Sequence, residues 1–399
     1  MDPEFFLSVH HAVEEYMYKR IFISLLFILL FVSCSQKEET STLNKDIKPA
    51  QVFSVENSTT KIPVVVVSGT PYEMGYQLGV ATKDDLIKCM FGFLELGQKS
   101  EDKYADEVLD DAWQKMLPYV DKRFIEELKG LADGAGVSLD KLRRAHMIPV
   151  VSSFACSGVA VWGDATTNGD LYHIRNLDFT MGAHLQDYPV IVVYKPNDGI
   201  AHIQTTFAGY IASHSGMNAE GVVLGEKGAS PSSEYPYNYD GIHFSLLFRT
   251  MLYDANNLDN ALEMIEAAKL IKRYYLYISD GKKETMGAAI AVVTTPDEVK
   301  LSIYKENEKP EGTPLKVMNN CIYYTMDNDV AHESLKSNAG KFDSEKMIAL
   351  SKAVASKGGN LLNVVYNAST LEMWVAYANG PADACDGEYI HVNMNDYLK

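Results

Sequence analysis

The stretch Cys156–Phe179, CSGVAVWGDATTNGDLYHIRNLDF, decides the fold of this 399-residue chain. Residues Ser157 to Trp162 are mostly apolar and typical of a β-strand, and a second strand-like run extends from Leu171 to Phe179. Between the two runs lies Asn168-Gly169, a dipeptide that tight hairpin turns favour. We therefore predict that this stretch forms an antiparallel β-hairpin.

The hairpin brings two charged side chains toward Cys156. With the turn in this region, antiparallel register places Cys156 opposite the segment Leu177 to Gly182, so Arg175 and Asp178 end near the sulfur atom. Since successive residues of a strand point to opposite faces, Arg175 and Asp178 can both face Cys156 only if the strand ends or twists there.

These three side chains suit acyl transfer by a thiolate. A neighbouring cation lowers the pKa of a thiol, and a carboxylate orients the base that activates it. A terminal α-amine, with a reference pKa of about 7.7 to 8.0, would supply that base if the chain were cut before Cys156. The alternatives are that Cys156 only packs in the core and that Arg175 and Asp178 form a structural ion pair.

The same stretch resembles the start of the catalytic chain of N-terminal-nucleophile (Ntn) amidohydrolases, where a Cys precedes a hairpin and an R-N-x-D-[FW] motif. In particular it resembles the acyl-CoA:6-aminopenicillanate acyltransferase family, whose relatives include choloylglycine hydrolases, acid ceramidase and N-acylethanolamine acid amidase. Further motifs of that family follow in the same order, at Gly69–Gly79 (GTPYEMGYQLG), Leu128–Val137 (LKGLADGAGV), Gly216–Gly221 (GMNAEG) and Leu371–Glu388. The resemblance extends from about Val64 to the C-terminus.

The resemblance implies an α+β fold, a four-layer αββα sandwich of two antiparallel sheets between helix layers. It also implies a precursor that cuts its own Ala155–Cys156 bond. The products are a mostly helical α chain, residues 62–155, and a catalytic β chain, residues 156–399, which stay associated. Mature Cys156 then carries the acyl group as a thioester, while Arg175 and Asp178 hold its amine and the substrate carbonyl.

The oxyanion-hole asparagine of these relatives has a less direct match. The relatives place it in a T-N-[HSY] motif, whereas this chain reads YTMDND at Tyr324–Asp329, so Asn328 is the candidate and Asn320 the alternative. Glu226 is either a site carboxylate or a solvated turn residue. Its segment Gly225–Gly228, GEKG, is similar to the acyltransferase family's G-E-T rather than to the G-L-N of choloylglycine hydrolases, so bile-salt specificity finds no support.

Composition narrows the class of protein. With 47% hydrophobic and 22% charged residues, the chain is typical of globular proteins. A formal net charge of -17 without a basic patch argues against a nucleic-acid partner. Five cysteines, at positions 34, 89, 156, 321 and 385, form no C-x-x-C pair, and no H-E-x-x-H motif occurs, so we expect neither a metal nor another cofactor.

The first 61 residues indicate export. Lys19-Arg20 precedes the apolar run Ile21–Val32, which is too short to span a bilayer and fits a signal peptide, with Met17 as a plausible start. Ser33-Cys34 resembles a bacterial lipobox, which implies cleavage before Cys34 and lipidation of its thiol. We therefore predict a leader over residues 1–33 and a polar tether over residues 34–61. The alternative is an uncleaved membrane anchor.

The remaining pattern predicts strands followed by helices and further strands. The expected helices are Tyr72–Phe93, Tyr104–Leu131, Phe244–Lys272 and Ser344–Ser356. The expected strands are Val190–Tyr194, Ala201–Thr206, Ile211–His214, Val222–Gly225, Ala288–Val293 and Val299–Tyr304, with a hairpin of Val364–Tyr366 and Met373–Ala376. Six tyrosines are expected either to line a groove or to belong to a surface loop near Pro236: Tyr235, Tyr237, Tyr239, Tyr274, Tyr275 and Tyr277.

From the sequence we expect an autoproteolytic Ntn amidohydrolase. We also expect it to be a bacterial lipoprotein that is periplasmic or anchored at the outer membrane or cell surface. Its expected partners are a small acylated amide, cleaved through Cys156, and the membrane, bound through Cys34. Two alternatives stay open. One is an acyltransferase of the penicillin acyltransferase type, and the other is a lipid-anchored binding protein that has lost activity.

Overall fold

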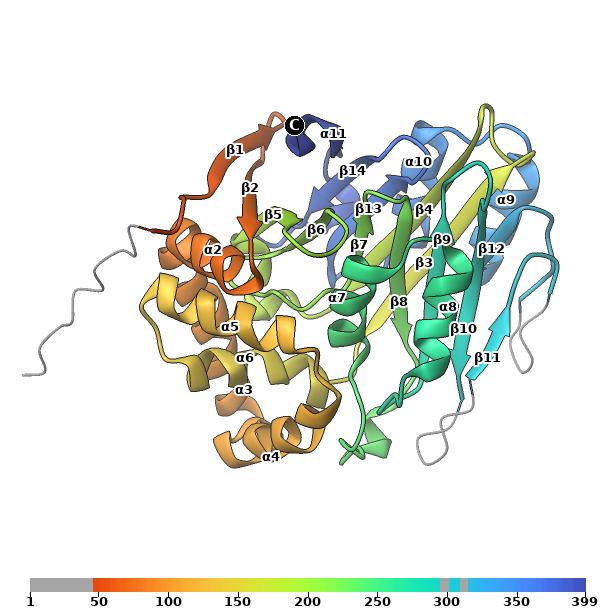
Figure 1. The fold of residues 1–399 in the computed structure, drawn as a ribbon. Coiled ribbons are helices and arrows are strands. Elements are labelled where there is room, and N and C mark those ends of the chain that lie inside the picture. The colour runs from red at the N-terminus through yellow and green to blue at the C-terminus, as the bar shows by residue number, and fades with distance from the viewer. Residues whose placement is uncertain (1–45, 295–300, 309–314) are drawn as a thin grey trace, which may run out of the picture. The chain divides into compact units, whose positions relative to one another are not determined.

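The computed structural model describes residues 46–294, 301–308 and 315–399 (Figure 1). The expected leader, the lipidation site Cys34 and the first part of the tether lie outside the described residues. In the part that is described, no helix combines the length and the hydropathy of a membrane-spanning segment.

Two β-sheets form the centre of the described chain. The first has nine strands in the order β1 (Gln51–Glu56), β2 (Lys61–Gly69), β5 (Pro189–Pro196), β6 (His202–Phe207), β7 (Gly216–Asn218), β8 (Val222–Gly228), β9 (Tyr274–Asp280), β10 (Gly287–Val293) and β11 (Leu301–Tyr304). Its neighbouring strands are antiparallel except β2 and β5, which are parallel. The second has six, in the order β12 (Cys321–Tyr324), β3 (Ala155–Gly163), β4 (Gly169–Asp178), β13 (Asn360–Asn367), β14 (Glu372–Tyr377) and β15 (Ile390–Asn393).

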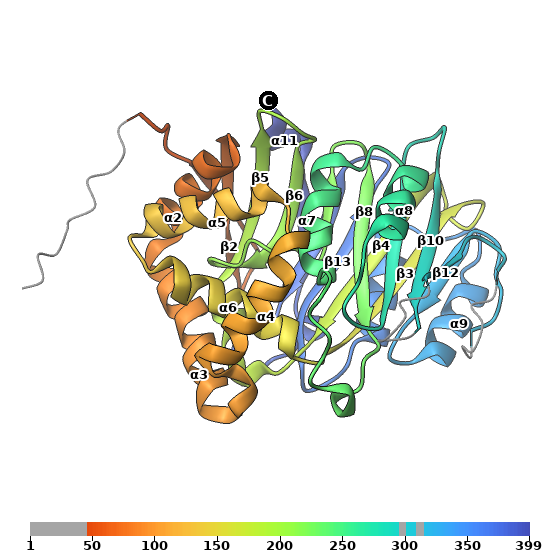
Figure 2. The ribbon, with the colours of Figure 1, turned by 60° about the horizontal axis from the view of Figure 1, so that its bottom comes forward.

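The two sheets pack face to face, and each carries helices on its outer side. Strands β3 and β4 of the second sheet contact β8 and β9 of the first. Helices α7 (Phe244–Asp254) and α8 (Leu258–Ala267) pack on the first sheet, and α9 (Asn328–Ser337) and α10 (Ser344–Val354) pack on the second (Figure 2). The predicted αββα order of layers is therefore confirmed.

A group of helices precedes the Cys156 hairpin and lies beside β2 and β5 (Figure 1). It consists of α2 (Pro71–Leu86), the π-helical turn η1 (Ile87–Phe91), α3 (Gly92–Ser100), α4 (Asp106–Met116), α5 (Lys122–Ala135) and α6 (Leu139–Val151). A capping box starts α2, since the Thr70 hydroxyl accepts a hydrogen bond from Glu73 N–H while the Glu73 carboxylate accepts one from Thr70 N–H.

Helices α2 and α5 approach each other through glycines. A Cβ atom at Gly75 would lie 2.0 Å from the carbonyl oxygen of Glu127, and one at Gly130 would lie 2.0 Å from that of Tyr72. No side chain fits at either position, because heavy atoms in contact keep distances of about 3.5–4.0 Å. Gly75 and Gly79 of the first motif and Gly130 and Gly134 of the second therefore serve the contact between the two helices.

A buried ion pair joins the α5 helix to the α7 helix. The Arg249 guanidinium donates to the Glu127 carboxylate, and both side chains are at most 2% exposed. Arg249 Nη1 also lies 2.5 Å from His202 Nε2, and the guanidinium stacks 4.2 Å from the centre of the Tyr194 ring. Since residue 127 precedes the predicted cleavage site and residue 249 follows it, this cluster links the two predicted chains.

The predicted hairpin is confirmed, with Cys156 opposite Leu177 and Ala155 opposite Asp178.

Several other predictions are wrong. The segment Ile211–His214 is irregular rather than a strand, and the tyrosine-rich segment expected as a loop includes β9. The last part of the predicted tether forms β1, which pairs with β2. The expected helix Tyr104–Leu131 is interrupted between Met116 and Lys122, where Pro118 lies, and Phe244–Lys272 is interrupted between α7 and α8 and ends at Ala267.

Candidate active site

Cys156 lies at the start of β3, between the two sheets, and its side chain is 0% exposed. The thiol donates to Glu226 Oε1, at an Sγ–Oε1 distance of 3.5 Å. Glu226 comes from β8 of the other sheet and is itself fully buried. The nucleophile candidate and the carboxylate therefore meet across the interface of the sheets. Of the two alternatives for Glu226, the solvated turn residue is wrong.

Arg175 completes this group from β4. Its Nη2 donates to the same Glu226 Oε1 at 2.8 Å, and both side chains are 0% exposed. The Nε and Nη1 atoms of Arg175 and the Oε2 atom of Glu226 have no hydrogen-bond partner among the described residues. The close approach of β8 depends on Gly225, because a Cβ atom there would lie 3.2 Å from the Arg175 Cγ and 2.8 Å from the His173 Nε2.

The electrostatics of this group keep the thiol neutral in the uncut chain. Burial raises the pKa of the Cys156 thiol well above its usual value, and the charges of Glu226 and Asp178 raise it further, while Arg175 opposes them. Burial also raises the pKa of Glu226 against the attraction of Arg175. The thiol therefore needs a nearby base before it can attack a carbonyl.

The Asp178 carboxylate makes its hydrogen bonds to residues other than Cys156. Its Oδ1 atom accepts hydrogen bonds from Asn360 Nδ2 at 3.0 Å and from Ser356 N–H at 3.2 Å. The strand β4 ends at Asp178, and its pairing with β13 shifts register there. The Oδ2 atom is buried without a partner in the described part of the chain, and burial raises the carboxyl pKa to about 6. Asp178 therefore holds unused acceptor capacity beside the Ala155–Cys156 bond.

Lys227 is a site residue that the sequence analysis missed. Its Nζ atom donates to the main-chain oxygen of Cys156 at 3.1 Å and lies 3.3 Å from Met326 Sδ. A thioether is a weak acceptor, so the ammonium keeps donor capacity for another group. Burial lowers the pKa of Lys227, and the charges of Cys156, Asp178 and Glu226 oppose this effect. The only sequence signal for Lys227 was its place next to Glu226.

The two asparagines proposed for the oxyanion hole do not contact this group. Asn328 Oδ1 accepts from Thr325 N–H at 2.8 Å and so closes the turn before α9. The main-chain oxygen of Asn320 accepts from Trp162 N–H at 3.0 Å. Trp162 lies six residues along β3 from Cys156, which corresponds to about 20 Å. The structure therefore contradicts Asn320 as an oxyanion donor.

Met326, in the same segment, contacts two residues beside Cys156. Its main-chain N–H donates to Ser157 Oγ at 2.9 Å, and its sulfur atom contacts Lys227. Ser157 Oγ in turn donates to the main-chain oxygen of Val354 at 3.1 Å. Where the resembling motif has an asparagine after threonine, this site therefore has a methionine beside a lysine.

Hydrogen bonds fix the start of the short segment that connects α6 to Cys156. The buried Lys272 ammonium donates to the main-chain oxygens of Ser152 at 2.6 Å and of Pro149 at 3.3 Å, at the end of α6. The Ser152 hydroxyl donates to Ile148 O at 2.7 Å. Beyond Ser152, the link to β3 contains Ser153 and Phe154. These contacts place the Ala155–Cys156 bond against the group around Glu226.

A narrow apolar pocket with a cavity volume of about 30 Å³ adjoins the site. It reaches the nucleophile because Leu177 is the strand partner of Cys156 and Phe154 precedes Cys156 by two residues. Its walls are Met90, Phe93, Pro149, Phe154, Leu177, Phe179, Leu185, Phe207, Tyr210, His214 and Leu361.

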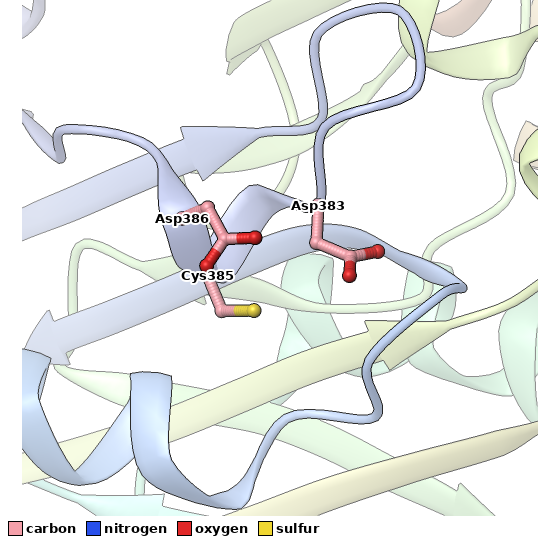
Figure 3. Close-up of side chains that lie close together, drawn as sticks. All are labelled: Asp383, Cys385 and Asp386. Atoms are coloured by element: carbon pink, nitrogen blue, oxygen red, sulfur yellow. The ribbon is translucent and has the colours of Figure 1, made fainter.

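A second cluster of possible ligand atoms lies away from this pocket. Side-chain atoms of Asp383, Cys385 and Asp386 lie within 4.8 Å of one another (Figure 3). Asp383 accepts from the main-chain N–H groups of Gly358 at 2.7 Å and of Asn360 at 3.0 Å. Asp386 pairs with Lys357. Both carboxylates therefore hold neighbouring parts of the chain.

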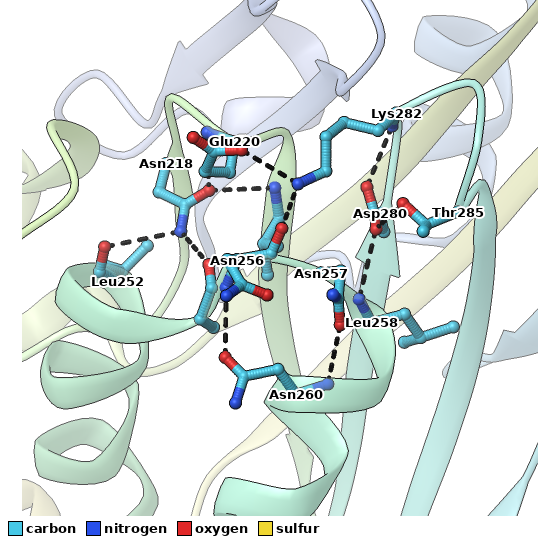
Figure 4. A network of polar contacts seen from close by, with 12 residues as sticks. Asn218, Glu220, Leu252, Asn256, Asn257, Leu258, Asn260, Asp280, Lys282 and Thr285 are labelled. Atoms are coloured by element: carbon cyan, nitrogen blue, oxygen red, sulfur yellow. Dashed lines mark hydrogen bonds and ion pairs between the residues drawn. The ribbon is translucent and has the colours of Figure 1, made fainter.

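The GMN motif is also structural. Asn218 Nδ2 donates to Ala255 O at 2.7 Å, and its Oδ1 accepts from the main-chain N–H groups of Glu220 and Val222 (Figure 4). Lys282 Nζ donates to Glu220 in the same network. The motif thus fastens the β7–β8 turn to the end of α7 and contributes no group to Cys156.

Known proteins resemble the chain in sequence. It is 27% identical to the protein dcd1B of Dictyostelium discoideum over 258 residues, which are 59% of this chain and 51% of that protein. It is 27% identical to dcd1A of the same organism over 272 residues, 60% of each chain. Over 112 residues it is 29% identical to the N-acylethanolamine-hydrolyzing acid amidase of Rattus norvegicus, covering 28% of this chain and 30% of the amidase. No family model matches the chain.

Solved structures also resemble the fold. The N-acylethanolamine-hydrolyzing acid amidase ortholog of Caenorhabditis elegans has a TM-score of 0.43 and 16% identity, covering 54% of this chain and 93% of that one. The conjugated bile acid hydrolase of Clostridium perfringens has a TM-score of 0.39 and 12% identity, covering 60% of this chain and 93% of that one. The resemblance to Ntn hydrolases predicted from the motifs is thus confirmed by the amidase relatives. The acyltransferase family in particular stays a prediction.

The buried Asp178 carboxyl predicts a pH-dependent stability of the uncut chain. A carboxyl pKa that rises from 3.8 in the unfolded chain to about 6 in the folded one destabilises the fold at high pH, by about 3 kcal/mol above pH 6 and by nothing below pH 4. In an uncleavable Cys156→Ala background, Asp178→Asn should therefore raise the free energy of unfolding by up to that amount at pH 7.5. Urea unfolding at pH 7.5 and pH 4 measures the effect. A gain that is equal at both pH values would contradict it.

Proposed function

We propose that the protein is an autoproteolytic Ntn amidohydrolase that cleaves a linear N-acyl amide through a thioester on Cys156. The observation that carries the proposal is the contact of the buried Cys156 thiol with Glu226, which is paired with Arg175, directly after a fixed link from α6. Similarity to amidases supports hydrolysis of a carbon–nitrogen bond.

The first proposed step cuts the chain. Glu226 accepts the thiol proton, and the sulfur attacks the carbonyl carbon of Ala155. The Ala155–Cys156 amide then becomes a thioester as the Cys156 nitrogen leaves and takes up a proton. Water hydrolyses this thioester, which gives a carboxylate on Ala155 and frees the thiol and the amine of Cys156.

In turnover the new amine acts as the base. It takes the thiol proton while the sulfur attacks the substrate carbonyl, and it then protonates the departing amine of the substrate. Water releases the acid from the thioester in the second half. The unpartnered Oδ2 atom of Asp178 suits the ammonium form of this amine. The free N–H groups of Arg175 and the ammonium of Lys227 suit the negatively charged carbonyl oxygen.

The apolar pocket beside Cys156 supports an acyl group as the part of the substrate that is bound there. Its walls present mainly aromatic and aliphatic side chains. The two chains of the cut protein stay associated in this proposal, because the buried Glu127–Arg249 pair joins them. Breaking such a pair by removing one partner costs about 3–5 kcal/mol.

Processing and activity together test the proposed mechanism. Wild-type protein should show two chains by intact mass, with Cys156 as the first residue of the larger one, and should release the amine from an N-acyl amide panel. Cys156→Ala should stay uncut and inactive, because the nucleophile is lost. Cys321→Ala, which removes another buried free thiol, should behave as wild type. An uncut wild-type chain, or a cut Cys156→Ala chain, would overturn the proposal.

The role of Lys227 is tested separately by replacing the ammonium with a neutral side chain. Lys227→Met should lower kcat of the mature enzyme by about 100-fold or more, as loss of an oxyanion donor does. Lys305→Met, at an exposed lysine paired with Asp259, serves as the matched control. The assay is done on protein whose processing has been verified by mass. An unchanged kcat in Lys227→Met would remove Lys227 from the mechanism.

Export and lipid anchoring through Cys34 form part of the proposal. The supporting observation is the order of three features in the sequence: the charged pair Lys19-Arg20, the apolar run Ile21–Val32 and the pair Ser33-Cys34. In a bacterial host, wild-type protein should incorporate a labelled fatty acid and sediment with membranes, while Cys34→Ala should do neither. Labelled Cys34→Ala protein would exclude this site of lipidation.

The alternative functions differ in what happens to the acyl group of the N-acyl amide. An acyltransferase would pass the acyl group to an added amine faster than to water. A binding protein that has lost activity would retain an N-acyl amide without releasing its amine. The same amide panel, run with and without an added acceptor amine, distinguishes these cases.

A further inference from the structure

The Leu371–Glu388 motif, which the proposed function leaves without a role, ends in a turn that holds the start of β13. The turn is η7 (Ala384–Asp386), and Asp383 directly precedes it (Figure 3). Asp383 Oδ1 accepts from the main-chain N–H of Asn360 at 3.0 Å. The main-chain N–H of Cys385 donates to the Asn360 side chain, at a distance of 2.8 Å to Oδ1. The turn therefore fixes both the backbone and the side chain of Asn360.

The contact with Cys385 decides which neighbour each end of the Asn360 amide faces. A main-chain N–H group only donates, so the amide oxygen faces Cys385 and the amide nitrogen faces the other way. Asn360 Nδ2 then donates to Asp178 Oδ1 at 3.0 Å and to Asn363 Oδ1 at 2.6 Å. The Asn360 side chain is fully buried. The amide thus has one orientation, and that orientation presents a donor to the Asp178 carboxylate.

A β-bulge brings Asn360 directly opposite Asp178. In the pairing of β13 with β4, Asn360 is the partner of Asp178, whereas Leu362 is the partner of Leu177, so one extra residue, Leu361, lies between the two pairs. With regular pairing, Leu361 rather than Asn360 would lie opposite Asp178. Bulges of this kind re-aim a side chain and are frequent beside active sites. The irregular pairing therefore serves the contact between the amide and the carboxylate.

We propose that Asn360, held by the turn that follows Asp383, positions the Asp178 carboxylate to bind the amine of mature Cys156. The inference rests on the proposed amidohydrolase function and adds a positioning residue to that same site. Asp178 Oδ1 accepts from Asn360 and from Ser356 N–H, which leaves Oδ2 for the ammonium form of the amine. Asn360 does not line the apolar pocket, so it acts through Asp178.

The hydrogen bond from Asn360 also influences the pH at which Asp178 becomes ionised. Burial raises the pKa of Asp178 to about 6, and the bond from Asn360 opposes this effect. The titratable groups that face Asp178 are Arg175 on β4, Lys227 on β8 and Cys156 on β3, and none of them changes when Asn360 is replaced. Loss of the donor should therefore raise the pKa of Asp178 further, by about one unit for one hydrogen bond to a carboxylate.

The test compares the pH profile of kcat for Asn360→Leu with that of wild type. Both proteins are verified as processed by mass, and the substrate is the N-acyl amide that wild-type enzyme cleaves fastest. Leucine has a similar size but no donor, so the acid limb of the profile should lie about one pH unit above that of wild type. The loss of kcat should be close to tenfold on that limb and should shrink as the pH rises. A merely structural role would lower kcat by the same factor at every pH.

The matched control is Asn218→Leu. Asn218 is also fully buried, uses both ends of its amide in hydrogen bonds and contributes no group to Cys156. This variant loses a buried amide of the same kind but should keep the acid limb of wild type.

Asp383→Asn is a second variant that reaches Asp178 only through Asn360. The Asp383 carboxylate accepts from two main-chain N–H groups, and an amide in its place cannot accept from both, because its nitrogen only donates. We expect the acid limb to move in the same direction as in Asn360→Leu, by a smaller amount.

The outcomes separate this inference from the function on which it rests. An acid limb of Asn360→Leu that coincides with that of wild type would overturn the inference and leave the amidohydrolase intact, as would an equal shift in Asn218→Leu. If Asn360→Leu yields no processed enzyme, Asp383→Asn decides: a raised acid limb supports the inference, and an unchanged one overturns it. A wild-type chain that stays uncut or cleaves no amide would overturn the proposed function and this inference with it.

Discussion

The buried pair of Glu226 and Arg175 is the constraint on which the site depends. It places opposite charges from the two sheets at 2.8 Å in a region without solvent. Removal of either partner would leave an unpaired buried charge, which costs about 3–5 kcal/mol. The thiol of Cys156 lies against the same carboxylate oxygen, so the packing of one sheet on the other also sets the position of the sulfur.

The helices before Cys156 position the bond that is proposed to break. Helices α2 and α5 pack at glycines where no side chain fits, and α6 ends where Lys272 holds its last carbonyl groups. Each of these contacts reduces the freedom of the link that follows. Since α5 is also joined to α7 through Glu127 and Arg249, the helical segment is fixed to both the link and the sheets.

The local parts of this structure could be predicted from the sequence, while the long-range parts could not. The hairpin and the placing of Cys156 opposite Leu177 follow from two strand-like runs around an Asn-Gly turn. Lys227 and Asn360 reach the site from β8 and β13, and no local pattern states which strands become neighbours. The β9 strand was missed because Tyr274 and Tyr277 are buried through long-range packing, whereas their sequence is compatible with a surface loop.

The hydrogen bond from Lys272 to Ser152 limits how far the chain just before Cys156 can move. Phe154 forms part of the pocket wall and also belongs to the short segment between that hydrogen bond and the Ala155–Cys156 bond. Three residues, fully extended, reach about 10 Å. If the Ala155–Cys156 bond is cut as proposed, the new end of the first chain stays within that distance of Ser152 as long as Lys272 holds it. The proposed cut would thus free the chain end that carries Phe154, a residue of the pocket wall, while Ser152 stays bound to Lys272.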